Sequence, residues 1–167
     1  MVRLRPFKSP DADRILPWLS DERVMAMWCS DLFQYPLTRE QLLNRMEQAD
    51  RKETEWVMTG VDEYGEVVGH LSMWADYRKN SLHLGLIVVD HQRRGQGLGR
   101  QMLDRAAAYA FDVLGVDQVT LGVFDSNPQA QACYCRAGFE KDYIEEEAME
   151  YHGEKWSRIH MVRKRKG

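Results

Sequence analysis

Cysteine, proline and long hydrophobic runs are scarce in this sequence, and each scarcity excludes a class of protein. Three cysteines and five prolines in 167 residues fit neither a disulfide scaffold nor a collagen-like or disordered chain. The longest apolar stretch, residues 84–89, is far shorter than the ~20 residues that span a bilayer. The first six residues lack the apolar core of a secretory signal. We therefore expect one cytoplasmic domain over residues 1–167, large enough to fold without disulfides or metal.

Positive charge is also scarce outside one short segment. The formal net charge is −3, and four of the 23 basic residues lie in the run 163–166, so the rest of the chain carries about −7. Such a chain is a poor electrostatic match to nucleic acid and suits a cationic ligand better. Cys133 and Cys135 stand two apart on an expected helix and point to opposite sides, and no His or Cys spacing resembles a zinc site. We expect no metal, nucleic-acid or membrane partner.

Hydrophobic periodicity predicts a mixed α/β fold. Thr38 followed by Gln41 fits a helix-capping box. Asn127 before Pro128 is typical of a helix start, and Gly115 of a helix end. Helices are expected over residues 9–28, 38–51, 97–114 and 127–138. Strands are expected over residues 2–5, 56–58, 67–74, 82–89, 119–123, 139–149 and 155–162, the last two forming a hairpin.

The most informative segment is the run 88–100, which has three glycines at alternate positions between a buried strand and an amphipathic helix. Glycines in this arrangement let backbone N–H groups turn toward one point, where the positive end of the helix adds its own field. Arg93, Arg94 and Arg100 would add charge-assisted contacts. The segment therefore predicts a phosphate-binding loop.

Three kinds of phosphate loop compete for this segment. A P-loop ends in Gly-Lys-Ser/Thr, whereas Gly99 is followed here by Arg100 and Gln101. A dinucleotide fingerprint needs glycines spaced two and then three residues apart, and the set Gly95, Gly97 and Arg100 breaks that spacing. The third kind is the Arg-Gly-x-Gly-x-Gly pyrophosphate loop of acyl-coenzyme A users. A plain tight turn would explain one or two of the glycines, but not three with flanking arginines.

Two segments together resemble the GNAT superfamily of acyl-CoA N-acyltransferases. Residues 89–99 are similar to its signature loop, and residues 126–139, with Asn127 and Tyr134, are similar to its second motif. The resemblance covers nearly the whole chain. The run 151–154 in the closing hairpin is similar to the branch that contains ribosomal-protein alanine acetyltransferases and spermidine acetyltransferases.

The resemblance implies a mixed, mostly antiparallel, V-shaped sheet of about seven strands that splays between residues 82–89 and 119–124. Acetyl-CoA would insert its pantetheine arm there, with its pyrophosphate at the N-terminus of the following helix. The implied cofactor-binding residues are Ile87, Val88, Val89, Arg94, Gly95, Gln96, Gly97, Leu98, Gly99, Arg100 and Asn127. The implied reaction is direct acetyl transfer to a primary amine, so no cysteine is a nucleophile candidate. Backbone N–H groups near Val88 and Val89 would polarise the thioester carbonyl.

Tyr134 matches the general acid of the family, which protonates the departing thiolate. A phenol can do this once it is held within hydrogen-bond range. The same residue also fits a buried core tyrosine, because Ala130 and Ala137 flank it. Asn127 can cap its helix and contact the cofactor together.

The general base stays open at the level of the sequence. Many relatives have a glutamate on the strand before the loop, whereas this chain has His83 in that region and no carboxylate. An imidazole of unperturbed pKa near 6.5 suits the role. His70 on the preceding strand is a second candidate, and water that carries the proton to solvent is a third.

The acceptor pocket is expected between the N-terminal helices and the closing hairpin. Aromatic side chains that fit its lining, as well as a core, are Trp28, Phe33, Tyr35 and Trp74. Acidic residues that fit either a cation site or a solvated face are Glu145, Glu146, Glu147 and Glu150, and strand alternation sends Glu145 and Glu147 to one side.

The sequence thus favours an acetyl-CoA-dependent N-acetyltransferase, and it leaves a protein N-terminus, a polyamine and a small amino compound open as acceptors. The alternative is a coenzyme A-binding regulatory module without turnover, which would not need Tyr134. A nucleic-acid-binding domain is a more distant alternative. A homodimer is plausible for the family.

Overall fold

A computed structural model describes residues 1–167 and contains one seven-stranded sheet. The strand order is β1-β2-β3-β4-β5-β7-β6, and every neighbouring pair is antiparallel except β4 with β5. The strands are β1 (Arg3–Pro6), β2 (Glu55–Val61), β3 (Val67–Asp76), β4 (Ser81–Val89), β5 (Gln118–Phe124), β6 (Glu140–Tyr151) and β7 (Glu154–Lys164). The predicted mixed, mostly antiparallel sheet is confirmed.

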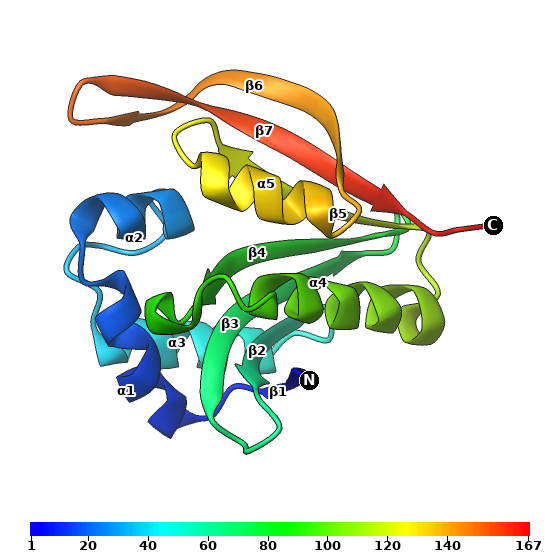
Figure 1. Cartoon of the computed structure of the whole chain (residues 1–167), viewed down its shortest axis with the longest axis horizontal. Coiled ribbons are helices and arrows are strands. Elements are labelled where there is room, and N and C mark those ends of the chain that lie inside the picture. The colour runs from blue at the N-terminus through cyan, green and yellow to red at the C-terminus, as the bar shows by residue number, and fades with distance from the viewer.

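Helices cover both faces of this sheet (Figure 1). The helices are α1 (Ala12–Ile15), α2 (Glu22–Cys29), α3 (Arg39–Asp50), α4 (Leu98–Ala108) and α5 (Pro128–Arg136). α4 and α5 pack on the main core, which includes Leu84, Met102 and Leu121. α1 and α3 pack on a second core around Ile15 and Leu42 on the other face. None of these helices combines the length and the apolar character needed to cross a bilayer.

The only parallel pair of strands forms a fork. β4 pairs with β5 from Ser81 to Leu84 alone, against Gln118 to Leu121. Beyond this point β4 stays paired with β3 as far as Val89, while β5 stays paired with β7. The backbones of β4 and β5 therefore separate as they approach the glycine loop, which confirms the predicted V shape.

A β-bulge in β4 marks the open part of the fork. The register with β3 shifts between His70 and Ser72, so Leu86 and Ile87 lie opposite one residue of β3. Leu86 has a φ of 51°, a left-handed conformation that is rare for a leucine. The bulge turns the Leu86 side chain to the α2 side, whereas Ile87 and Val89 pack against the main core. Regular strand alternation could not predict this change of face.

The predicted continuous helix over residues 9–28 is wrong. The chain forms a 3₁₀ turn (Ser9–Asp11), α1, a second 3₁₀ turn (Leu16–Leu19) and then α2. Pro17 lacks the backbone N–H that an α-helix interior needs. Asp21 then caps a new helix by accepting a hydrogen bond from the backbone N–H of Val24 at 3.0 Å. The later helices and all seven strands lie where the sequence predicts them, with β2 extended to Val61. The helix predicted over residues 97–114 consists of α4 and a π-helical segment (Tyr109–Leu114).

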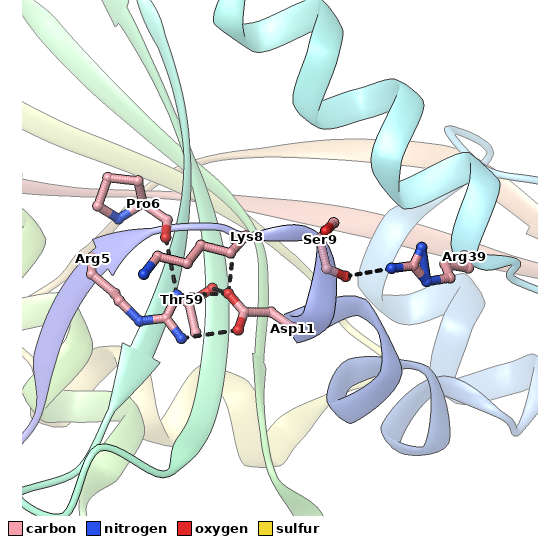
Figure 2. A network of polar contacts seen from close by, with 7 residues as sticks. All are labelled: Arg5, Pro6, Lys8, Ser9, Asp11, Arg39 and Thr59. Atoms are coloured by element: carbon pink, nitrogen blue, oxygen red, sulfur yellow. Dashed lines mark hydrogen bonds and ion pairs between the residues drawn. The ribbon is translucent and has the colours of Figure 1, made fainter.

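A buried carboxylate fastens the start of α1 to the sheet (Figure 2). Asp11 is 4% exposed and accepts hydrogen bonds from both guanidinium nitrogens of Arg5 at 2.7 and 2.9 Å. It also accepts from the backbone N–H of Lys8 at 2.9 Å and from the hydroxyl of Thr59 at 2.7 Å. Burial opposes ionisation of Asp11, but these donors outweigh it and hold its pKa below the usual range. The network fixes the start of α1 beside β1 and β2.

Candidate active site

The loop between β4 and α4 has the form of an anion cradle. Asp90 caps a short turn (His91–Arg93) by accepting from the backbone N–H of Gln92 at 3.0 Å. Gly95 and Gly97 then adopt φ angles of 81° and 75°, where a side chain would strain the backbone. α4 starts directly after Gly97 without a side-chain cap. Its first N–H groups are therefore available to a negatively charged ligand.

Gly99 joins this loop to the fork and to α5. A Cβ at Gly99 would lie 3.3 Å from Sγ of Cys133 and 3.5 Å from Cγ2 of Val89. α5 begins at Asn127, whose side chain accepts from the backbone N–H of Ala130 at 3.2 Å, as predicted for a helix cap. The end of β4, the start of α4 and α5 therefore lie against one another at the mouth of the fork.

Tyr134 lies on α5 next to Cys133, inside the main core. It is 8% exposed, its ring centroid lies 6.5 Å from that of Phe139, and its hydroxyl makes no hydrogen bond to the protein. Burial raises the pKa of the Tyr134 phenol well above its ordinary value of about 10. The hydroxyl is therefore a protonated donor at neutral pH. Both predicted descriptions of Tyr134, as a core residue and as a proton donor, fit this environment.

The family model of the GNAT acetyltransferases matches residues 12–139 of the chain. The chain belongs to the GNAT family. It is an acetyltransferase that takes the acetyl group from acetyl-CoA and transfers it to an amine.

Solved structures of other GNAT enzymes share the fold over the whole chain. The spermidine N-acetyltransferase of Vibrio cholerae, solved with CoA and spermine, is 20% identical over 96% of this chain and 94% of its own, with a TM-score of 0.83. A chimera of that enzyme with hSSAT is 19% identical over 98% of this chain and 95% of its own, with a TM-score of 0.81. At such identities the likeness shows the fold.

The arginines of this GNAT loop differ in their surroundings. Arg94 and Arg100 are exposed beside the glycines and the helix start. Arg93 instead contacts other side chains: its guanidinium donates to a carboxylate oxygen of Asp62 at 3.2 Å and to the side-chain oxygen of Gln96 at 3.1 Å. The three arginines that the sequence treats alike thus differ: Arg94 has no acidic partner, Arg100 has a loose ion pair with Asp104 at 3.9 Å, and Arg93 is engaged by Asp62.

His83 lies in the paired part of the fork, on the face opposite α4. Its Nδ1 lies 2.9 Å from the hydroxyl oxygen of Thr120, and its ring centroid lies 6.0 Å from that of Trp74. The side chain is exposed at one edge, yet loss of hydration around the ring lowers its pKa to about 4, helped by the charges of His160 and Arg158. The pKa of His83 thus lies below the unperturbed value of about 6.5, and the role of His83 as proton acceptor stays a prediction.

His70 is sealed in the protein on the α1–α3 face of β3. It is 2% exposed, its ring meets that of Phe7 edge to face at 5.6 Å, and burial lowers its pKa to about 4. Its Nδ1, the hydroxyl of Ser72 and the indole N–H of Trp28 are buried polar atoms without a hydrogen-bond partner in the protein. His70 has no surface through which an amine could reach it directly.

The predicted acceptor-side aromatics divide into two groups. Trp28 stacks on Phe33 with ring centroids 5.6 Å apart, and both pack with Trp74 around Leu86 of the bulge. Tyr35 is 44% exposed, and its hydroxyl donates to a backbone carbonyl ahead of α2 at 2.8 Å. Three of the four aromatics therefore surround the bulge, and Tyr35 does not.

The acidic run of β6 is interrupted by a second bulge. The register with β7 shifts between Glu145 and Met149, and Glu147 has a φ of 49°. The predicted alternation of Glu145 and Glu147 on one side is therefore wrong. Glu145 accepts from Arg158 at 3.2 Å, and Glu147 lies 3.4 Å from the ammonium of Lys155. Two of the acidic residues are thus already paired with cations.

A contact between α2 and the β6–β7 hairpin was missed by the sequence reasoning. Arg23 donates to both carboxylate oxygens of Glu154, and its guanidinium lies 5.2 Å from the ring centroid of Trp156 and 5.8 Å from that of Tyr151. We call these four residues the clasp. Arg23 and Glu154 lie 131 residues apart, so no local pattern connects them. Only the unusual Arg-aromatic-acidic composition of the two segments signals the contact.

Proposed function

We propose that this enzyme acetylates a primary amine at the fork between β4 and β5, with acetyl-CoA entering from the α4–α5 side. The observation that carries the proposal is the fork itself. β4 loses its pairing with β5 after Leu84, directly before the bulge and the anion cradle. An extended thioester can pair with a free strand edge while its phosphates bind the loop at one end of that strand.

The cofactor contacts follow from this placement. The pantetheine arm pairs with the backbone of Ile87, Val88 and Val89, and the pyrophosphate binds the N–H groups of the segment from Gly95 to Gly99, including those of Gln96, Gly97 and Leu98. Arg94 and Arg100 neutralise its charge. Asn127, at the start of α5, closes the mouth of the fork.

The chemistry is a direct transfer between two substrates. The neutral amine attacks the thioester carbonyl carbon, a C–N bond forms, and the C–S bond breaks with its electron pair left on sulfur. The backbone N–H that faces the open edge of β4, near Val88 and Val89, stabilises the negative charge on the carbonyl oxygen. Tyr134 donates its proton to the thiolate. The buried site that raises the pKa of Tyr134 also disfavours a bare thiolate, so a hydrogen bond from the phenol stabilises the leaving sulfur. Complete proton transfer gives the free thiol of coenzyme A and a phenolate, which regains its proton from water.

The attacking nitrogen must also lose a proton. We assign this step to His83, because it lies at the base of the fork and is neutral at pH 7. A group of pKa about 4 holds a proton only briefly, so His83 passes it on to solvent at its exposed edge. Direct loss to water is the competing route.

The experiment is mass spectrometry of products formed from acetyl-CoA and a panel of amines. The panel contains spermidine, spermine, peptides that begin with alanine or serine, a lysine peptide, free amino acids and an aminoglycoside. A product heavier by one acetyl group supports the proposal and identifies the acceptor class. Coenzyme A binding without any product, from this panel or from hydrolysis of the thioester, supports the regulatory-module alternative.

A further inference from the structure

The cofactor loop has little packing of its own to hold its shape. Between Asp90 and Leu98 every side chain is exposed except that of Arg93, which is half-buried. Two left-handed glycines lie in the same stretch. A loop of this kind loses conformational entropy when it orders around a ligand, unless something outside it fixes it beforehand.

Arg93 connects the loop to such a fixed point. Its guanidinium donates to Oδ2 of Asp62 at 3.2 Å, and its Nε donates to the side-chain oxygen of Gln96 at 3.1 Å. The contact to Gln96 spans the glycine Gly95, and the contact to Asp62 reaches the turn between β2 and β3. One side chain thus joins both halves of the loop to another part of the protein.

Asp62 is itself held rigidly. It is 6% exposed, and its Oδ1 accepts from the backbone N–H groups of Tyr64 and Glu66, both at 2.9 Å. Its backbone N–H donates to the carbonyl of Glu66 at 3.0 Å, and its carbonyl accepts from Gly65 at 3.0 Å. The carboxylate therefore has one oxygen committed to its own turn and the other directed at Arg93.

We infer that Asp62, Arg93 and Gln96 form a brace that positions the cofactor loop before coenzyme A arrives. Asp62 and Arg93 are positioning residues in this inference: they act through the backbone of Gly95 to Gly99 and do not bind the phosphates. The inference rests on the proposed function, since it concerns the diphosphate end of the same cofactor.

A different role for Asp62 would change coenzyme A affinity in the opposite direction. If Asp62 only restrained a phosphate-binding Arg93, removal of the carboxylate charge would free the arginine and tighten coenzyme A binding. If the brace positions the loop, the same change weakens binding. The sign of the effect of one substitution therefore decides.

Asp62→Asn is the test, because the amide keeps the oxygen that the turn needs and weakens the bond to Arg93. Glu66→Gln is the matched control: it removes one negative charge from the same turn, and the Glu66 side chain contacts only the exposed Arg14, at 3.2 Å. Coenzyme A affinity is measured by titration calorimetry. We expect Asp62→Asn to bind about tenfold more weakly, the size of one charge-assisted hydrogen bond, and Glu66→Gln to bind like the wild type.

A second readout separates positioning of the loop from general damage. S-acetylpantetheine carries the thioester but no diphosphate, so its kcat/KM is expected to be the same in Asp62→Asn and in the wild type. Arg93→Gln is expected to reproduce the loss for coenzyme A, and the double variant to lose no more than either single one. Arg93→Gln also supplies the comparison if Asp62→Asn folds poorly.

The outcomes are distinct. Tighter or unchanged coenzyme A binding in Asp62→Asn overturns the brace, and so does an equal loss with S-acetylpantetheine. A wild-type protein that binds no coenzyme A overturns the proposed function and the brace together. Wild-type binding that is insensitive to both single variants overturns the brace alone.

Discussion

The two sides of the fork are built in different ways. The cofactor side consists of backbone N–H groups, glycines and one helix start, all within a single run of the chain from β4 to α4. The acceptor side consists of side chains from α2, β3, β4 and the β6–β7 hairpin, which meet only in the folded protein. A site made of backbone can be recognised from a short motif, whereas a site made of distant side chains cannot. This difference explains why the reaction class is evident from the sequence and the acceptor is not.

The two sides also differ in what supports them. α4, α5 and Tyr134 rest on a core cluster of 21 buried residues, whereas the residues around Leu86 and around Trp156 rest on clusters of three each. Local stability follows buried apolar contacts. We therefore expect α4 and α5 to be rigid and the acceptor side to adapt, and the following changes test that division.

The largest effect is expected from Tyr134→Phe. The ring and its packing on Phe139 remain, so the affinity for coenzyme A is unchanged, but the thiolate loses its proton donor and kcat falls about 1,000-fold. Steady-state kinetics and calorimetry measure the two quantities. Tyr109→Phe, which removes a hydroxyl at the far end of α4, is the control and keeps full turnover. Normal turnover in Tyr134→Phe would remove this residue from the mechanism.

The next effect concerns stability on the acceptor side. The folded-state pKa of His70, about 4, lies below its unfolded value of about 6.5, so the unfolded chain binds the proton first as pH falls. The contribution of neutral His70 is complete above pH 6.5, and about 3 kcal/mol of it is lost as pH falls toward 4. Asp11 does not produce this slope, because its lowered pKa confines its loss to more acidic pH.

Urea unfolding at a series of pH values measures this loss. His70→Phe removes the titrating group, so the slope of its unfolding free energy between pH 6.5 and 4 should be flatter than that of the wild type. Parallel curves for the two proteins would show that His70 is not buried as a neutral ring.

His83 gives a test in kinetics instead of stability. If His83 passes the proton from the amine to solvent, kcat decreases only as pH falls toward about 4, where the imidazole becomes charged. His83→Gln should lower kcat about tenfold and remove that acidic limb. A limb near pH 6.5 in the wild type, or a variant with an unaltered profile, would contradict this role and favour direct loss to water.

Alanine substitutions at two glycines with similar positive φ angles compare the two sides of the fork at similar backbone strain. Gly97 in the cofactor loop and Gly153 in the hairpin turn have φ angles of 75° and 83°, and a Cβ at either would meet no atom within 4 Å. Alanine at each should cost about 1 kcal/mol through the backbone alone. Only Gly97→Ala should also weaken coenzyme A binding, about tenfold, since it distorts the anion cradle. Equal affinities in the two variants would mean that the cradle does not bind the cofactor.

The smallest effect is expected at the clasp. Arg23→Gln frees the hairpin from α2 and should raise the KM of the amine about threefold, while the KM of acetyl-CoA stays the same. Arg14→Gln, which breaks an exposed ion pair with Glu66, should change neither KM. A rise in the KM of acetyl-CoA in Arg23→Gln would show that the two sides are not independent.

The sequence predicts the helices and strands of this fold better than the breaks and bulges within them. The strands and the helices from Thr38 onward follow from periodicity and capping residues, because those signals are local. The break before α2 was also signalled, by Pro17 and by Asp21, but apolar residues at helical spacing on both sides masked it. The bulge at Leu86 leaves no trace in the pattern, since every residue from Leu84 to Val89 is apolar or glycine.

The parts of the candidate site that the sequence does not predict are its long-range contacts and its pKa values. The anion cradle is contiguous, so its residues can be proposed from the sequence, whereas the contact of Arg93 with Asp62, 31 residues away, cannot. The pKa values of His70 and His83 depend on what the fold places around them, so an unperturbed value is a poor guide to either.

The most direct test of the division between the two sides is amide hydrogen exchange with and without coenzyme A. We expect coenzyme A to slow exchange at Ile87 to Val89 and at Gly95 to Arg100, and to leave exchange in α2 and the β6–β7 hairpin unchanged. Protection at α2 or the hairpin, with none in the loop or at the open edge of β4, would contradict it.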